Sequence, residues 1–448
     1  MRSLSTRRPT VRWELLERHL EEAEFLWTQW EHALWSPEHT LASVAEGDEG
    51  RLRAHLDALV LGGTAVATRL LLPALTSEDP ARVASAAWAL LSAEDADWRE
   101  PVFHPLEQGA EETHPGLLRA LELLDRPDLH ALLLRKLPAL PPALQAGVLR
   151  VARVRHLDPS AALEKLDWEA DPALHAEALR ALAFAPRTQA GDARLARALS
   201  HAHPTVSAAA LETGLLLGSR EAWEHARGST SRAALLSLAV AGESKDLADL
   251  VARLKGGSPA AEVIWAAGFS GRLLAAEALL PLLREEAQAP LAATSFAAIT
   301  GLPMAPPFLV EAPADADDED SEEEAEPEAE DREAWLPAPR ALPGEVDALA
   351  VEAWWTRRRG DFTEGFRYLR GAPVTVEVLT SALETEPMLR RPSLAWEVAL
   401  RGGGAPWVET RQWTQVQREQ AHAPRGQRPE SRTLAGRWPR GRRSDTPA

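Results

Sequence analysis

A proline that recurs about every 30 residues is the feature that most constrains the fold of this chain. In the clearest copies it follows an Asp or a His, and apolar residues come about 4, 7 and 10 positions later. The interval from Pro204 to Pro259 is about twice as long, so we expect a copy without proline near Ser231. The copies begin at Pro80, Pro115, Pro142, Pro172, Pro204 and Pro259.

Each of these prolines is expected in the first turn of a helix, where the amide hydrogen that proline lacks has no intrahelical partner. The spacing that follows puts Ala and Leu on one helix face, and small Ala side chains let helices approach closely. A pair of such helices leaves an apolar face that only the next pair can bury. The repeat therefore predicts an all-α fold, with an α-solenoid of short helix pairs over residues 64–302. Composition agrees, because Ala and Leu dominate the apolar residues while the chain has one Tyr and eight Phe.

Helical segments are also expected on both sides of the repeats. Residues 1–63 form a predicted N-terminal helical cap, in which apolar residues recur at steps of three and four from Trp13 to Leu34. Residues 342–414 form a predicted C-terminal block rich in Trp and Arg. Within the block we expect one helix from Glu345, a second over 375–383 and a third over 388–400.

Two charged segments complete the chain. Residues 303–341 form an acidic, Pro-rich linker, in which Glu311 to Glu333 include 14 acidic residues and one Arg, a net charge of −13 out of −18. Residues 415–448 form a basic tail, with eight Arg and two Glu between Arg418 and Arg443. Both segments have few large apolar side chains, so we expect both to be disordered. The two could pair with each other through their opposite charges.

The sequence excludes several kinds of chemistry. It contains no Cys, so it has no thiol nucleophile, disulfide or thiolate metal site, and this fits a reducing cytoplasm. No stretch reaches the roughly 18 apolar residues that a membrane-spanning helix needs. The glycine-rich and serine motifs of nucleotide-binding proteins and hydrolases do not occur. We therefore expect a cytoplasmic protein that binds no cofactor.

Several blocks of sequence resemble a known family. They read HLEEAEFLW from His19, LRAHLDALVLGG from Leu52, AITGL from Ala298, and LPGEVDALAVEAWWTRRRGDFTEGFRYLRGAPVTVEVL from Leu342. Together they resemble a proteobacterial family of HEAT-repeat proteins of unknown function, and the repeat period fits the short, PBS-lyase type of HEAT repeat. Members of the family recur in genomes that encode type VI secretion systems. The resemblance implies a HEAT-like α-solenoid and supplies no catalytic residues.

Some titratable pairs could carry chemistry, but each has a structural explanation. Glu111 and His114 have the spacing of half a di-iron site, which would need a second copy. His201 and His203 could approach one metal ion, or could belong to the turn that caps the helix at Pro204. His19 with Glu22, and His55 with Asp57, could be acid–base pairs, or the two His could be buried and hydrogen bonded.

The densest aromatic and basic cluster lies in the C-terminal block. Trp and Arg are the residues most enriched at the centres of protein interfaces, and one Trp of an adjacent pair must point away from the other. The same residues could instead cap the end of the repeats. The candidate interface residues are Trp354, Trp355, Arg357, Arg358, Arg359, Phe362, Arg367 and Tyr368, with Trp27 and Trp30 from the N-terminal cap.

These observations predict a non-enzymatic scaffold or adaptor that binds protein partners, and the family resemblance implies a connection with type VI secretion. One alternative is a HEAT-like enzyme, such as a lyase or a DNA glycosylase, and another is a purely structural spacer that oligomerises. The basic tail lacks interleaved aromatic residues, so nucleic acid is not expected as a partner, and neither is a membrane.

Overall fold

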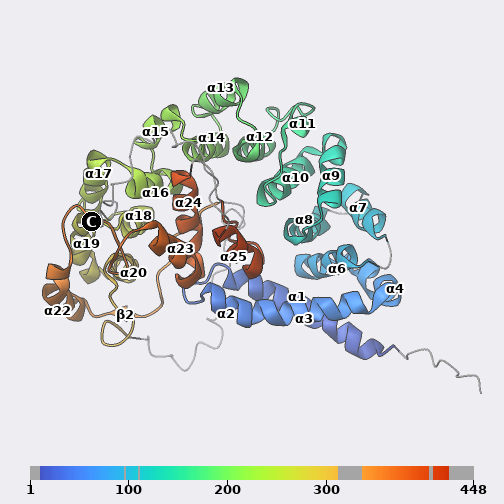
Figure 1. Ribbon diagram of the computed structural model, residues 1–448, viewed down its shortest axis with the longest axis horizontal. Coiled ribbons are helices and arrows are strands. Elements are labelled where there is room, and N and C mark those ends of the chain that lie inside the picture. The colour runs from blue at the N-terminus through green and yellow to red at the C-terminus, as the bar shows by residue number, and fades with distance from the viewer. Residues whose placement is uncertain (1–10, 95–96, 109–110, 311–334, 403–406, 423–448) are drawn as a thin grey trace, which may run out of the picture. The chain divides into compact units, whose positions relative to one another are not determined.

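The computed structural model describes residues 11–94, 97–108, 111–310, 335–402 and 407–422 (Figure 1). Helix accounts for 69% of the structure and strand for 3%, so the protein is all-α in class. The chain forms two compact units. Unit 1 comprises Met1–Ala33 and Val44–Arg155, and unit 2 comprises Leu34–Ser43 and His156–Ala448. The boundary between the units thus falls inside the expected repeat region, residues 64–302.

Unit 1 begins with α1 (Trp13–Ala33), which packs along α3 (Asp48–Leu61) and against α6 (Pro80–Ser92). Leu20, Ala23, Trp27 and Trp30 are buried on one face of α1, which confirms the apolar stripe. Helices α6, α8 and α10 pack on one another in chain order. The remaining elements are α2 (Leu41–Glu46), whose first three residues belong to unit 2, α4 (Gly63–Val66), the π-helical turn η1 (Ala67–Leu71), α5 (Leu72–Ala74), α7 (Arg99–Gln108), η2 (Glu111–Thr113), α8 (His114–Leu123), α9 (Pro127–Lys136), η3 (Leu137–Ala139) and α10 (Pro142–Val154).

Unit 2 continues the same alternation. Helices α12, α14, α16, α18 and α20 each pack on the next in chain order, and the odd-numbered helices connect them. The elements are α11 (Ser160–Leu163), α12 (Pro172–Ala181), η4 (Leu182–Phe184), α13 (Gln189–Ala198), α14 (Pro204–Leu216), α15 (Arg220–Ala226), α16 (Arg232–Ala241), α17 (Ser244–Leu254), α18 (Ala261–Ser270), α19 (Leu273–Leu279), η5 (Leu280–Arg284) and α20 (Ala289–Thr300).

The repeat in the sequence matches the helix starts. From α8 to α20 the even-numbered helices begin at residues 114, 142, 172, 204, 232, 261 and 289, which are 28 to 32 residues apart. Asp79 and Asp171 each cap the helix that follows, because their side chains accept hydrogen bonds from two backbone amides of its first turn. The expected copy without proline is confirmed, since the side chain of Ser231 caps α16 in the same way.

The C-terminal block of unit 2 starts with a short antiparallel ladder between β1 (Leu309–Val310) and β2 (Glu345–Val346). A helix expected from Glu345 therefore starts three residues later, where the side chain of Asp347 accepts a hydrogen bond from the Ala350 amide. The block contains α22 (Ala348–Arg358), η6 (Arg359–Asp361), β3 (Tyr368–Leu369) paired with β4 (Ala372–Pro373), α23 (Val376–Thr385), η7 (Met388–Arg390), α24 (Arg391–Arg401) and α25 (Thr414–His422).

Both charged segments are shorter than expected. Leu309, Trp335 and Leu336 fall within the predicted linker but are buried. Residues 415–422 fall within the predicted tail but are helical, and Gln417 is buried there. The rest of the linker, 311–334, and of the tail, 423–448, lies outside the described residues.

Among the described residues, no single helix is long and apolar enough to cross a membrane. One bent pair, Leu41–Leu61 with Gly63–Ala74, reaches the required length and apolar composition when its two halves are taken together, and the angle between the halves is 101°.

Candidate functional site

The two tryptophans expected at an interface on α1 lie inside unit 1. The indole Nε1 of Trp30 donates a hydrogen bond to Glu49 at 3.1 Å, and the ring of Trp30 meets Trp27 edge to face at 6.0 Å. Both side chains are buried, and Glu49 belongs to α3. They hold α1 against α3, so the structure places them in the core and not on a surface that a partner could reach.

The aromatic residues of the C-terminal cluster are also buried. Ring contacts run from Phe296 on α20 to Trp355 at 5.3 Å, from Trp355 to Phe362 at 5.2 Å, and from Phe362 to Tyr368 at 4.9 Å. Trp354 is half-buried and meets Phe296 at 6.3 Å. Both rings of the tryptophan pair therefore contact α20 and tie the block to the repeat helices.

The basic members of the cluster separate into two groups. Arg367 is buried, and Arg359 donates to Glu277 on α19 at 2.5 Å. Arg357 and Arg358 are exposed on the last turn of α22. Leu349, two turns earlier on α22, is 71% exposed. Of the residues expected at an interface, Arg357 and Arg358 are exposed and the side chain of Arg359 is 41% exposed.

Arg367 caps the end of a repeat helix. Helix α18 ends at Gly271, whose φ of +63° turns the chain away and leaves the last carbonyls of the helix without intrahelical partners. Arg367 donates from Nε to the carbonyl oxygen of Ser270 and from Nη2 to that of Phe269, both at 2.9 Å. A buried cation at a helix C-terminus is also favoured by the helix dipole.

The same guanidinium is held by a buried carboxylate from α24. Glu397 accepts from Arg367 at 2.5 and 3.1 Å and from Arg401 at 2.8 and 2.6 Å. Burial alone would raise the pKa of Glu397, but the two guanidinium groups outweigh burial and hold that pKa below its usual value. Arg401 also donates to the carbonyl oxygen of Val240 at the end of α16. One carboxylate thus links two arginines that each contact the end of a repeat helix.

A second buried carboxylate, Glu386, accepts from Arg370 at 2.6 and 3.0 Å and from Arg390 at 2.8 Å. The guanidinium of Arg390 lies 4.2 Å from the ring centroid of Phe269 on α18, in cation–π geometry. The next residue, Arg391, donates to the backbone oxygen of Leu383 and to the side chain of Gln417 on α25. Burial lowers the pKa of Arg391 to about 9. The contact with Arg391 explains why α25 is ordered.

Aromatic side chains also gather between α24 and the repeat helices. Trp335, just after the acidic linker, lies 5.6 Å from Trp396 on α24 and 5.2 Å from Trp407, measured between ring centroids. The indole of Trp396 donates to Ser237 on α16 at 3.0 Å. Sequence reasoning missed Trp335, although a Trp-Leu-Pro triplet inside an acidic, Pro-rich segment is a visible signal.

Ion pairs join successive helices in both units. In unit 1, Arg119 on α8 contacts Glu31 at 2.5 Å and Glu122 at 2.9 Å, and Arg150 on α10 also contacts Glu122 at 2.9 Å. In unit 2, Arg180 on α12 bridges Glu177 at 2.8 Å and Glu212 on α14 at 2.9 Å. Arg119, Arg150 and Arg180 are 31 and 30 residues apart, so the ion pairs recur with the repeat.

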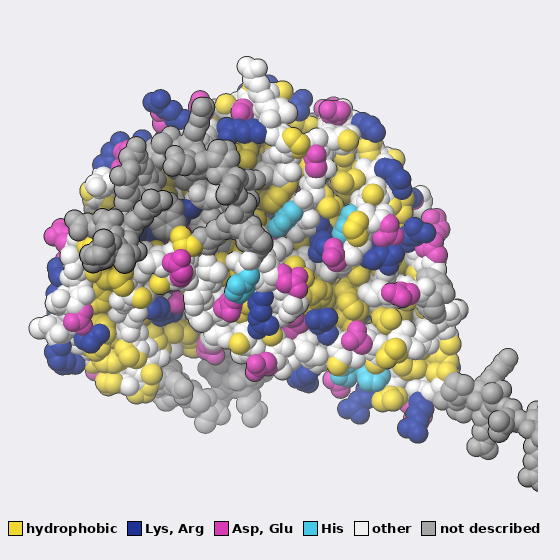
Figure 2. Space-filling model, in the orientation of Figure 1, with side chains coloured by type: hydrophobic (Ala, Val, Ile, Leu, Met, Phe, Trp, Pro, Cys, Tyr) yellow, Lys and Arg dark blue, Asp and Glu magenta, His cyan; other side chains and the backbone are white. Residues whose placement is uncertain are grey.

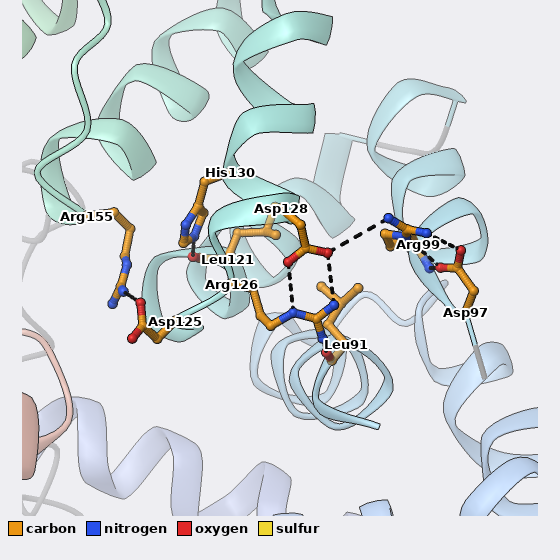
Figure 3. Close-up of polar contacts among 9 residues, drawn as sticks. All are labelled: Leu91, Asp97, Arg99, Leu121, Asp125, Arg126, Asp128, His130 and Arg155. Atoms are coloured by element: carbon orange, nitrogen blue, oxygen red, sulfur yellow. Dashed lines mark hydrogen bonds and ion pairs between the residues drawn. The ribbon is translucent and has the colours of Figure 1, made fainter. Parts of the chain in front are cut away.

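A more exposed network lies at the edge of unit 1 (Figure 3). Arg126 binds Asp128 through two bonds of 3.0 Å and also donates to the carbonyl oxygen of Leu91. Arg99 contacts Asp97 at 2.5 Å, and the hydrogen bonds from this guanidinium lower the pKa of Asp97 to about 2. These pairs fix the turns between α6, α7 and α9.

The titratable pairs expected from sequence are arranged differently. Nδ1 of His19 lies 3.0 Å from Nδ1 of His55, so the two histidines pair with each other and not with Glu22 or Asp57. Burial, and then the neighbouring His19, lower the pKa of His55.

The other two pairs lie at helix starts. The ring of His201 accepts from the backbone amide of His203, the residue before α14. Glu111 starts η2 and His114 starts α8. Over the described ranges, no group of three or more His, Asp or Glu side chains is placed to hold a metal ion.

Comparison with known proteins adds little. No protein-family model matches the chain, and no curated protein matches it. A solved structure, that of YibA from Escherichia coli, aligns with 65% of this chain and 98% of its own length, at 14% identity and a TM-score of 0.28. That score is too low for the likeness to bear on fold or function.

Proposed function

We propose that this protein is a scaffold or adaptor that binds protein partners, and that its repeat helices form a HEAT-like α-solenoid. The stacking of α6, α8 and α10 in unit 1, and of α12 to α20 in unit 2, supports the solenoid. From α6 to α20 the even-numbered helices start every 28 to 34 residues, as expected when each helix pair buries the apolar face of the previous one.

The observation that carries the proposal is how unit 2 holds its own C-terminal block. Arginines of the block donate to carbonyl oxygens at the ends of α16 and α18, and Trp396 donates to Ser237 on α16. Apolar burial combined with hydrogen bonds to main-chain ends is the chemistry by which helical repeat proteins hold a polypeptide. The repeat helices of unit 2 therefore already act as a binding surface for protein, in this case for a segment of the same chain.

The exposed surface of α22 is the part of the block that we assign to an external partner. Leu349 and Arg357 are exposed on the same side of the helix, two turns apart, and Arg358 is exposed on the last turn, where it pairs with Asp361 at 2.9 Å. Arg is among the residues that contribute most to binding in protein interfaces, and guanidinium groups favour an acidic partner surface.

The charge distribution supports a protein partner over nucleic acid. On the face shown in Figure 2, Lys and Arg side chains are interspersed with Asp and Glu. A protein that excises bases or tracks a phosphate backbone needs a basic stripe or cleft. A connection with type VI secretion is supported by the family resemblance alone, and it is part of the proposal on that basis.

A co-purification experiment tests the proposal. The tagged full-length chain is expressed in its native organism beside a variant carrying Leu349→Asp, Arg357→Glu and Arg358→Glu, and retained proteins are quantified by mass spectrometry. A matched control carries Arg220→Glu on α15, where the side chain is 85% exposed and pairs with Glu224. We expect one or two stoichiometric partners with the wild type and the control, and their loss with the triple variant.

Partners that still bind the triple variant would show that the exposed surface of α22 is not the binding site. Recovery of nucleic acid, or of a small molecule without any stoichiometric protein, would overturn the adaptor function itself and favour a HEAT-like enzyme.

A further inference from the structure

Residues 335–344 include no helix or strand. Their first three side chains, Trp335, Leu336 and Pro337, are nevertheless buried. These side chains are buried against residues of α16, α18 and α24. An irregular triplet held on a helical scaffold has the form of a bound peptide.

The first side chain of the triplet enters an aromatic cluster. Trp335 contacts Trp396 and Trp407 at 5.6 and 5.2 Å between ring centroids. Trp396 is itself fixed by its hydrogen bond to Ser237 on α16, so its ring presents a preorganised wall. Aromatic rings of this kind select a large, flat side chain at the first position.

The second and third side chains pack beside the same helices. Leu336 and Pro337 line a small cavity together with Trp265 on α18, Ser393 on α24 and Arg232 on α16. Arg232 donates from Nη1 to the carbonyl oxygen of Leu336 at 3.4 Å. The segment therefore meets three helices through its side chains and one arginine through its main chain, as extended peptides do in grooves.

We propose that this cleft between α16, α18 and α24 is a peptide-binding groove, and that Trp335–Pro337 occupies it as an internal ligand. The external occupant is a partner protein whose extended segment carries an aromatic residue, a large aliphatic residue and proline in succession. This inference rests on the proposed adaptor function and names the chemistry of one partner. The proline suits the site because it holds the segment extended before it binds.

The internal ligand has the advantage of its tether over an external peptide. A short tether gives it a local concentration of about 1 mM. If the untethered segment binds with an affinity of about 100 μM, it lowers the apparent affinity of a competing peptide about tenfold.

A direct binding experiment follows from this value. A fluorescent peptide spanning residues 331–341 is titrated into the full-length chain and into a Trp335→Ala, Leu336→Ala double variant, in which the groove is vacated. We expect the double variant to bind about tenfold more tightly than the wild type. The control peptide carries the same two alanines and should bind neither chain, and Arg232→Ala in the double variant should weaken binding.

Equal binding of the native and control peptides by a folded double variant would overturn the proposal. If the double variant loses its helical circular dichroism, a second measurement is made on the wild-type chain. In that measurement the peptide is present at millimolar concentration and carries a photoreactive residue in place of Leu336. Cross-links to residues 232–241, 261–270 or 391–401 support the groove, whereas cross-links elsewhere, or none, overturn it.

The same preparations separate this inference from the proposed function. A wild-type chain that sediments as a dimer, and as a monomer when Trp335 and Leu336 are replaced, would make a second copy the occupant and overturn the external partner. Peptide binding in the groove without any partner in the co-purification would refute the adaptor and keep the groove. Stoichiometric partners without peptide binding would keep the adaptor function and refute the groove.

Discussion

Replacing Glu397 by Gln should destabilise unit 2 far more than the loss of one ion pair on the surface. The carboxylate is 1% exposed and accepts four hydrogen bonds from Arg367 and Arg401. Gln keeps the shape of the side chain but removes its charge, so two buried guanidinium groups lose their only shared anion. Leaving a buried charge uncompensated costs about 3–5 kcal/mol.

The structure offers a control with the same chemistry at the surface. Arg284 and Glu352 form a two-bond pair at 3.0 and 2.8 Å, with 61% and 32% of their side chains exposed. An exposed pair of this kind contributes about 0–1 kcal/mol. Glu352→Gln therefore changes the same functional group and leaves both partners solvated.

Thermal unfolding followed by circular dichroism measures the difference. For a domain of about 150–250 residues, 1 kcal/mol corresponds to about 2–4 °C in Tm. The transition of unit 2 is assigned by limited proteolysis of fragments within 156–422. We expect Glu397→Gln to lower its Tm by about 6–20 °C, and Glu352→Gln by less than about 4 °C. Equal losses of stability in the two variants, or a loss below about 1 kcal/mol for Glu397→Gln, would show that burial does not set the strength of the ion pairs between Glu397 and its two arginines.

Three further predictions follow from single positions. Gly271→Ala should lower the free energy of unfolding by about 1–3 kcal/mol, because the backbone has a φ of +63° and a Cβ would lie 2.5 Å from the carbonyl oxygen of Tyr368. The loss is measured as a fall in Tm, and Gly360→Ala, where no atom lies within 4 Å of the added Cβ, is the control. Asp171→Ala should cost about 1 kcal/mol in a urea titration by removing the cap of α12, and Asp171→Ser should restore most of it. Burial lowers the pKa of His130, so the folded state favours its neutral form. Protonation then favours the unfolded chain, and stability should fall as the pH drops below about 6.5, the unfolded value. A urea midpoint that rises between pH 7.5 and pH 5.5, or a fall that His130→Asn leaves unchanged, would contradict this.

Local signals predicted the helical part of the structure well. A proline after Asp marks a helix start because it combines a side-chain cap with a residue that needs no amide partner, and both α6 and α12 begin at such a pair. Even the copy without proline was located, because Ser231 caps α16 by the same chemistry. These effects act within four residues of chain, so a single sequence contains all the information they need.

The candidate interface was predicted less well, for a physical reason. Trp355, Phe362 and Arg367 have the residue types of an interface, and they do form one, but their partners are α18 and α20 of the same chain. The chemistry that buries an aromatic or arginine side chain is the same whether its partner is internal or external. Residue types alone therefore could not tell a core contact from an exposed patch.

The sequence by itself determined the all-α class, the period of the helices and the helix starts at Asp79, Asp171 and Ser231, because these depend on neighbours along the chain. Tertiary structure alone decided which charges and rings meet. Glu397 finds Arg367 across 30 residues, Trp396 finds Ser237 across 159, and His19 finds His55 across 36. Such pairings depend on the stacking of one helix on another, and no pattern within a single helix encodes them. For the same reason, Trp335 reads as part of a charged linker in the sequence and becomes a buried side chain only where α24 meets the repeat helices.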